Sequence, residues 1–296
     1  MKRILFYILA VSLYSLPVFS AEVNISSPNG DFKMKVYDKG NRIYYSVNYL
    51  NQSIVLESLL GINGNGEWKD GVRVDKSVTA SVDTLWKPVY GERSHIRDYY
   101  NRYEIDIVQA DNPKQKLKLI VRAYNEGVAF RYFFPGGEYL HITGEYTQYT
   151  LPKGAKAWFT KRAQSVYEFL PFQDWKGESE RPLVIELPQG LYVLLTEAEM
   201  INYARTKFVV VDAKTNTLVG KMYGDVDDIA PYKTPWRVIM AASQPGELIE
   251  HNDLILNLNE PNAIENPWWI RPGKVMREVT LTTDEPHLPK GWNFAW

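Results

Sequence analysis

The sequence has no cysteine among its 296 residues. Disulfide frameworks, thiolate metal sites and cysteine nucleophiles are therefore excluded. The sequence also lacks an excess of one charge, because 34 Lys and Arg residues face 35 Asp and Glu residues. Proteins that bind nucleic acid or anionic lipid through bulk charge carry a basic excess. Neither kind of partner is expected here.

Common catalytic motifs are also missing. The sequence contains no Gly-x-Ser-x-Gly elbow and no P-loop. Its four histidines are scattered, with no pair at helical spacing, so zinc binding and histidine catalysis are poorly supported. Aromatic residues, in contrast, make up 14% of the chain, which suits packed sheets and surfaces that contact sugars.

The first twenty residues have the pattern of a signal peptide. Lys2 and Arg3 precede the apolar run Ile4–Leu16, and small residues follow at Ser20-Ala21. The alternative is a membrane anchor, but the apolar run is shorter than the roughly 20 residues that span a bilayer. We therefore expect residues 1–20 to be removed and the mature protein to be periplasmic or secreted, with no remaining membrane segment.

Alternating apolar residues predict short strands along most of the mature chain. The pattern starts with a hairpin over Asp31–Tyr49 and recurs many times, separated by Gly, Pro and Asn turn signals. The further strand segments are Lys116–Arg122, Gly127–Phe134, Leu183–Leu187, Leu191–Leu195, Phe208–Val211, Arg237–Ala241 and Leu254–Leu258. Glu247–His251 is the best helix candidate, and no strand–helix alternation is present. The sequence predicts one all-β domain, a large two-sheet sandwich of mostly antiparallel strands.

Several carboxylates are candidates for chemistry. Glu197 follows the strand Leu191–Leu195, where a side chain can point into a cleft and hold a cation or a sugar hydroxyl, but position alone does not establish this role. Glu260 lacks the barrel context of a glycosidase acid and is expected to be a loop residue. The acidic segment Gly224–Asp228 lacks EF-hand spacing and is expected to be a solvated turn.

Two other polar segments are candidate sites. Tyr90–Asn101 is dense in charge, Tyr and Asn, and either a binding loop or an ion-paired surface segment fits it. Arg122–Arg131 contains an Asn-Glu-Gly turn between two strands. A structural role is expected there, with the arginines at its two ends meeting nearby carboxylates.

An ordered set of motifs resembles the N-terminal domain of glycoside hydrolase family 97, a family of exported α-glucosidases and α-galactosidases. The resemblance covers roughly Ser27–Lys274. It rests on Trp86–Arg93, Arg122–Tyr132, Thr196–Ala198, Thr234–Ile239, Asn257–Pro261 and Trp269–Lys274. Several motifs in this order are far more specific than any one of them.

The resemblance implies a β-super-sandwich of the galactose mutarotase-like type, spanning residues 21–274, that precedes a catalytic (β/α)₈ barrel. In the family, the barrel carries the catalytic carboxylates and most ligands of a calcium ion. The N-terminal domain lends that calcium one carboxylate, and the matching position here is Glu197. No catalytic residue is assigned to this chain, its substrate-binding residues are unknown, and the implied substrates are α-linked glucosides or galactosides, with a slight lean toward galactosides.

The chain departs from the family after Lys274. Residues 275–283 resemble an intact junction toward the barrel, but the last thirteen residues do not resemble what should follow. We expect residues 275–296 to be a truncated junction, from a truncated, frameshifted or split gene. The protein is then a non-catalytic support for a barrel, with an exposed sticky face that favours self-association.

Two alternatives stay open. A stand-alone carbohydrate-binding module would stack sugars on some of its tryptophans, of which the candidates are Trp86, Trp158, Trp175, Trp268 and Trp269. A subunit of a split enzyme would pair with a separate catalytic barrel chain.

Overall fold

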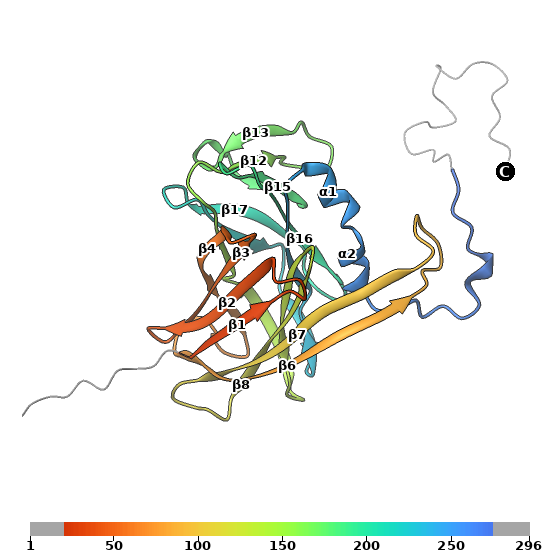
Figure 1. Cartoon of the computed structure of the whole chain (residues 1–296). Coiled ribbons are helices and arrows are strands. Elements are labelled where there is room, and N and C mark those ends of the chain that lie inside the picture. Colours follow the sequence, from red (N-terminus) through yellow and green to blue (C-terminus); the bar gives the residue numbers. More distant parts are fainter. Residues whose placement is uncertain (1–20, 275–296) are drawn as a thin grey trace, which may run out of the picture.

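The computed structural model describes residues 21–274. The predicted signal peptide and the predicted tail at 275–296 lie outside these described residues. Within the described part, all strand ladders are antiparallel and helices are few and short. The prediction of an all-β sandwich is confirmed (Figure 1). No helix in residues 21–274 has the length and apolar character needed to cross a membrane.

One layer of the sandwich is a large sheet of ten strands. In spatial order its strands are β13 (Glu168–Pro171), β12 (Lys156–Phe159), β15 (Leu183–Glu186), β16 (Tyr192–Ala198), β21 (Trp236–Ala242), β9 (Gly127–Phe134), β8 (Lys116–Tyr124), β7 (Ile96–Gln109) and β6 (Val72–Trp86), and β20 (Tyr232–Lys233) also pairs with β9.

Three smaller sheets make up the rest of the β structure in residues 21–274. The first contains β1 (Glu22–Ser26), β2 (Phe32–Lys39), β3 (Arg42–Tyr49) and β4 (Gln52–Leu60). The second contains β11 (Gln148–Thr150), β18 (Thr217–Met222), β17 (Thr206–Asp212) and β14 (Glu178–Ser179), and the third contains β19 (Val226–Ile229), β10 (Tyr139–Glu145) and β5 (Ile62–Gly64). Strands β2 and β3 form the predicted hairpin, and its turn residues Gly40 and Asn41 both have positive φ, as a two-residue hairpin turn requires.

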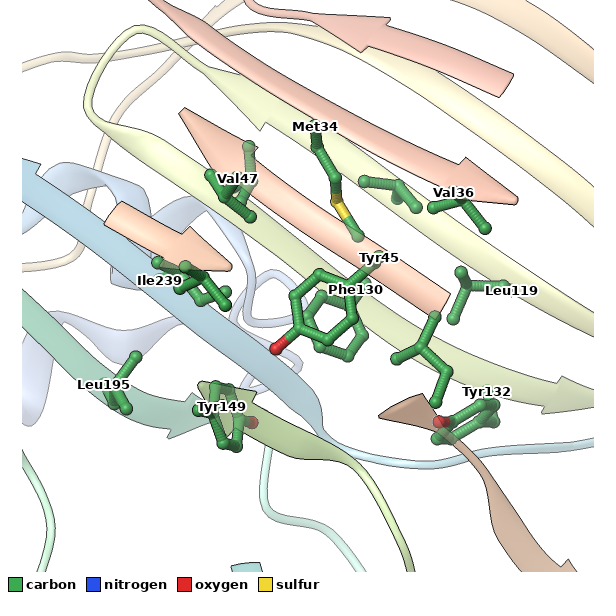
Figure 2. Close-up of a cluster of buried hydrophobic side chains, with 14 of the residues drawn as sticks. Met34, Val36, Tyr45, Val47, Leu119, Phe130, Tyr132, Tyr149, Leu195 and Ile239 are labelled. Atoms are coloured by element: carbon green, nitrogen blue, oxygen red, sulfur yellow. The ribbon is translucent and has the colours of Figure 1, made fainter. Parts of the chain in front are cut away.

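The main core lies between the large sheet and the smaller sheets (Figure 2). Tyr45 from β3 meets Phe130 from β9, with ring centroids 5.3 Å apart. Along β16, Val193 and Leu195 face this core, and Ile239 of the neighbouring β21 joins them. The two-residue period of each strand therefore decides which side chains are buried, and each large one stabilises the fold by roughly 1.5–3 kcal/mol.

The opposite face of the large sheet carries a second apolar cluster under two short helices. These are α1 (Pro245–Glu250) and α2 (Asp253–Asn257), and two 3-10 turns, η1 (Phe172–Asp174) and η2 (Pro267–Trp269), lie elsewhere. Helix α1 confirms the predicted helix near Glu247–His251. The predicted strand at Leu254–Leu258 was wrong, because this segment is mainly α2. Leu254 and Leu258 are both buried, at helical spacing, and so short an apolar run fits either period.

Strands β6 and β7 leave the sandwich as a long two-stranded ribbon (Figure 1). Val72 and Val74 of β6 are buried, but no later residue of this strand is. The far end of the ribbon is fixed to the C-terminal helices: Trp86 Nε1 donates to Asn257 Oδ1 at 2.7 Å. Arg93, in the loop beyond β6, donates to the Asp253 carboxylate at 2.8 Å. These contacts hold the ribbon in place, since an isolated two-stranded ribbon is marginally stable in water.

Candidate functional site

Glu197 lies one residue before the end of β16, inside the sandwich. It continues the inward series begun by Val193 and Leu195, and its side chain is only 2% exposed. A buried carboxylate needs compensating charge, and two arginines supply it. Arg237, the directly opposite residue on β21, donates from Nη1 to Oε1, and Arg181 contacts Oε2 through Nε.

Arg237 is itself held by a second carboxylate, Glu145 at the end of β10. Its Nε donates to Glu145 Oε1 at 2.9 Å, and its Nη2 donates to Oε2. Tyr203 adds a hydrogen bond to the same carboxylate at 3.3 Å. Burial opposes the charged form of Arg237, but the adjacent charges of Glu145 and Glu197 outweigh it and raise the pKa well above its usual value. The two carboxylates and two arginines, here called the inner charge cluster, balance one another in charge.

The oxygens of Glu197 have different surroundings. Oε1 accepts hydrogen bonds from Arg237 and from the Thr206 hydroxyl, the latter at 2.8 Å. Oε2 is buried and accepts no hydrogen bond, although Arg181 lies in ion-pair contact with it. In residues 21–274 no group of three or more His, Cys, Asp or Glu residues has the geometry to hold a metal ion. Both oxygens of Glu197 are thus in contact with an arginine, Oε1 with Arg237 and Oε2 with Arg181.

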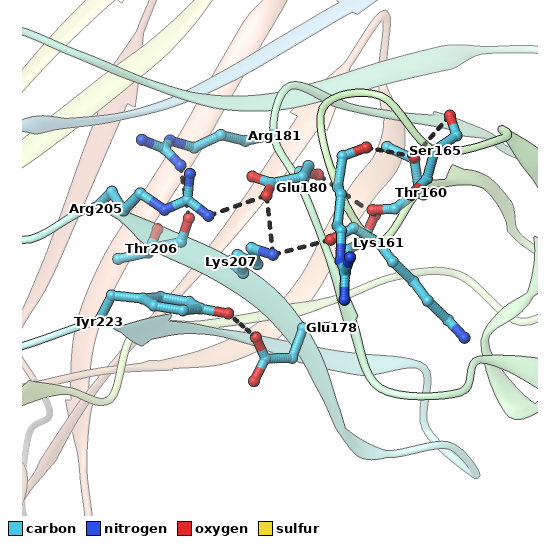
Figure 3. A network of polar contacts seen from close by, with 12 residues as sticks. Thr160, Lys161, Ser165, Glu178, Glu180, Arg181, Arg205, Thr206, Lys207 and Tyr223 are labelled. Carbon is cyan, nitrogen blue, oxygen red and sulfur yellow. Dashed lines mark hydrogen bonds and ion pairs between the residues drawn. The ribbon is translucent and has the colours of Figure 1, made fainter.

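A polar network lies beside Arg181 on strands β14 and β17 (Figure 3). Arg181 Nη1 donates to the backbone oxygen of Thr206 at 2.8 Å. The neighbouring Glu180 accepts from Arg205 at 3.0 Å and from Lys207 at 2.9 Å. Desolvation raises the pKa of Glu180, but the hydrogen bond and charge of Lys207, with help from Arg205, outweigh it and lower the pKa.

A second polar cluster, built around the single carboxylate of Glu199, lies on the other side of β21. Glu199 follows β16 with a φ of +54°, and it accepts from Arg131 Nη1 and, at 3.0 Å, from Trp236 Nε1. Arg131 and Arg122 both lie over the Trp236 ring, at 4.1 and 4.9 Å from its centroid. The expectation that an arginine of Arg122–Arg131 meets a carboxylate is confirmed, whereas Glu199 was not predicted as the partner. The sequence around Glu199 contains no pattern that predicts a positive φ at this residue.

The remaining candidate residues are dispersed. Glu260 is exposed and follows α2 outside any helix or strand, and 3.8 Å separates its carboxylate from Lys233. In Gly224–Asp228, the Asp227 carboxylate binds the Tyr139 hydroxyl and, at 2.7 Å, His141 Nδ1, and these bonds lower its pKa. The segment Tyr90–Asn101 divides into a loop that supplies the Arg93 ion pair and the start of β7.

The tryptophan candidates for sugar stacking also differ in environment. Trp175 packs within the fold against Phe159, with ring centroids 4.9 Å apart, and Trp86 forms the hydrogen bond described above. Trp158 is 43% exposed and packs against Phe169. Trp268 and Trp269 are 77% and 61% exposed. Among the five candidates, only Trp268 and Trp269 are adjacent in the sequence and both have largely exposed rings.

Comparison with known protein families shows to which family this chain belongs. The model for "Glycosyl-hydrolase 97 N-terminal" matches residues 25–261. The chain belongs to this family. The match covers both Glu197 and Glu199 and ends just after α2. The resemblance drawn from the sequence motifs is confirmed.

Relatives of this family 97 domain are longer enzymes. A retaining α-galactosidase of Bacteroides thetaiotaomicron is 22% identical over 93% of this chain and 46% of its own length. A probable retaining α-galactosidase of Streptomyces bingchenggensis is 24% identical over 54% of this chain and 26% of its own length. A family 97 enzyme of Pseudoalteromonas sp. strain K8, solved in complex with acarbose, has a TM-score of 0.78 and 25% identity over 85% of this chain and 40% of its own. The chain thus spans less than half the length of these relatives.

Proposed function

We propose that this domain supports the catalytic part of a family 97 glycoside hydrolase and does not itself hydrolyse glycosides. Ordinary glycoside hydrolysis needs two carboxyl groups, one of them free to donate a proton and the other to attack or activate water. Glu145 and Glu197, the carboxylates of the inner charge cluster, both bind the same arginine. Paired in this way, they suit a structural or ligand-holding role better than acid–base chemistry.

The observation that carries the supporting role is the set of large exposed apolar side chains on the ribbon and in the C-terminal part of the described chain. Val78 and Leu85 on the ribbon are 64% and 65% exposed, and Ile249 on α1 is 79% exposed. Trp268 and Trp269 follow in the same part of the chain, close to the end of the family match. Exposed apolar side chains that gather into one patch are typical of a surface that packs against another domain, and we propose that part of this set does so.

The calcium role of Glu197 belongs to the same proposal. Calcium accepts oxygen ligands from separate elements and can join two domains across one site. The proposal rests on the position of Glu197 in the family motif, and because Arg181 contacts its Oε2 in this structure, that side chain has to move before a calcium ion binds there. We propose that the catalytic part supplies the remaining ligands. The substrates of the assembled enzyme are then α-linked galactosides or glucosides. We also propose that the protein is exported to the periplasm or the exterior, because residues 1–20 have the pattern of a signal peptide.

A chimera tests the supporting role. Residues 21–274 replace the matching part of the Bacteroides α-galactosidase, and turnover of p-nitrophenyl α-galactoside is measured. We expect turnover by the chimera and none by the 21–274 domain alone, with or without calcium. A companion chimera carries Val78→Lys and Leu85→Lys, which lie on opposite faces of the ribbon. It should lose most of that turnover, because a charge then enters the proposed contact whichever face packs against the catalytic part.

Two results would contradict the proposal. One is turnover by the lone domain, which would mean that the sandwich holds an active site of its own. The other is equal turnover by both chimeras, which would remove the ribbon from the contact. Val211→Lys, the same kind of change at a 52% exposed valine on β17 and away from the ribbon, is the matched control.

A carbohydrate-binding module is the second candidate, and the adjacent exposed rings of Trp268 and Trp269 favour it. Apolar faces of sugars stack on such rings. Titration of the domain with maltose and melibiose distinguishes the two functions. Saturable binding that is lost in Trp268→Ala and Trp269→Ala supports the binding module. Absence of binding to either sugar favours the supporting role.

A further inference from the structure

The ten-stranded sheet ends in two strands that differ in how their outer edges are protected. One end is β13, which has four residues and finishes at Pro171. Shortness and proline both keep an edge strand from pairing with another chain. The other end is β6, which has fifteen residues and contains neither proline nor glycine. The sheet is therefore open to a further strand at β6.

The start of the β6 edge is covered by the hairpin of β2 and β3. The Val72 N–H donates to the Asn41 backbone oxygen at 3.0 Å. The Val74 N–H donates to the Asp38 carboxylate, also at 3.0 Å. Beyond Val74, the backbone of β6 forms hydrogen bonds with β7 and with no other segment of the described chain. The outer backbone groups of Lys76–Trp86, on the projecting ribbon, are thus free to bind an extended strand (Figure 1).

The composition of this free stretch favours strand pairing. Between Lys76 and Trp86 the only charged residue is Asp83, and the Arg97 guanidinium neutralises it through hydrogen bonds of 2.7 and 2.8 Å. Four of the residues between them are β-branched, namely Val78, Thr79, Val82 and Thr84. A long edge with little charge and high strand propensity is a template for another chain.

We propose that β6 pairs with β6 of a second copy of this chain, antiparallel and with Ala80 on the two-fold axis. Directly opposite residues of an antiparallel pair lie on the same face, so a two-fold register joins residues of equal parity. With Ala80 opposite itself, Val78 of each copy faces Val82 of the other copy. Asp83 then faces Ser77, so like charges do not meet. The edge is therefore complementary to itself, and cross-strand valine pairs stabilise the contact.

This dimer goes beyond the proposed function and does not depend on it. Pairing along the edge uses the backbone groups of β6. Both faces of the ribbon stay free for the contact proposed with the catalytic part.

A single cysteine tests the register, because the chain has no cysteine of its own. In Ala80→Cys the two cysteines lie opposite each other, with Cα atoms about 4.5–5.5 Å apart, which a disulfide can span. Mild oxidation of the mature chain should give a covalent dimer on a non-reducing gel. Thr84→Cys is the matched control, because its two cysteines lie roughly 26 Å apart, at about 3.3 Å per residue, and should not cross-link.

Charge at the same position tests the dimer in solution. Analytical ultracentrifugation of the mature chain should show a monomer–dimer equilibrium. Ala80→Lys and Ala80→Glu each place like charges opposite each other and should weaken dimerisation by about tenfold or more. An equimolar mixture of the two variants should restore the dimer, which a loss of folding in either variant could not do.

Three results would overturn the proposal. A wild-type chain that stays monomeric at every concentration would leave the edge to a strand of the catalytic part. Equal cross-linking of the two cysteine variants would show unspecific collision. A dimer that both charged variants retain would place the contact elsewhere than on β6.

Discussion

Glu197 and Glu199 are two residues apart, yet they serve opposite faces of the same sheet. Glu197 points into the sandwich, where two arginines and Thr206 surround it. Glu199 turns to the other face through its positive φ and binds Arg131 and the Trp236 indole. Glu197 Oε2 accepts no hydrogen bond and has only the ion-pair contact with Arg181. Glu199 accepts a hydrogen bond from Trp236, a member of the second apolar cluster. The comparison teaches that two residues of the same parity can serve opposite faces of a sheet when one of them has a positive φ.

The largest expected effect comes from removing the centre of the inner charge cluster. Arg237→Met leaves Glu145 and Glu197 buried without their shared partner, and breaking a buried pair in this way costs about 3–5 kcal/mol. The free energy of unfolding in urea measures the loss. Arg93→Met, at a more exposed ion pair with Asp253, should cost under about 1 kcal/mol. Similar losses for both would contradict the central place of Arg237.

The cluster around Glu199, on the other face of the sheet, should respond less strongly. Glu199→Gln leaves the buried Arg131 without its carboxylate, and loss of a charged hydrogen bond costs about 1.5–3 kcal/mol. Urea unfolding again measures the effect, with the exposed Glu260→Gln as control. A loss larger than that of Arg237→Met would reverse the order of the two clusters.

A smaller effect should follow from removing one neutral donor at Glu197. Thr206→Val keeps the side-chain shape but deletes the hydrogen bond to Oε1, which is typically worth about 0.5–1.5 kcal/mol. Thr84→Val, on the exposed ribbon, is the matched change and should be nearly neutral. Thermal unfolding of the two variants provides the measurement, and an unchanged Thr206→Val protein would show that the arginines alone hold Glu197.

The smallest effect concerns pH and the network beside Arg181. Because the pKa of Glu180 is lowered in the folded protein, its ion pairs stabilise the fold above the ordinary glutamate pKa of 4.5. That contribution is lost as the pH falls through the folded pKa. Glu180→Gln should therefore reduce stability at pH 7 by under about 1 kcal/mol and not at low pH. Equal destabilisation at pH 7 and pH 3 would show that charge is not involved.

Much of the fold could be predicted from the sequence because strand alternation and turn residues are local signals. The hairpin of β2 and β3 and the strands around Gly127–Phe134 are examples. The error at Leu254–Leu258 shows the limit, since so short an apolar run fits a helix or a strand. The ribbon was not predicted either. Apolar and polar residues alternate along β6 as they do in a half-buried strand, although the residues after Val74 are not buried.

The site was less accessible to sequence reasoning. The position of Glu197 at a strand end could be predicted, but its partners come from Glu145, Arg181 and Arg237, which are far apart along the chain. Only the strand order brings them together. The two faces of Glu197 and Glu199 could not be distinguished, because both residues have the same parity and one φ angle decides the outcome.

The most direct test of the account compares these two carboxylates in the assembled enzyme. The calcium dependence of p-nitrophenyl α-galactoside turnover is measured for the chimera and for its Glu197→Gln and Glu199→Gln variants. Since even indirect partners of a metal ligand change metal affinity by about 10–100-fold, Glu197→Gln should raise the calcium requirement at least tenfold. Glu199→Gln should leave that requirement unchanged. An unchanged requirement in Glu197→Gln, or an equal shift in both variants, would contradict the proposal that Glu197 is a calcium ligand.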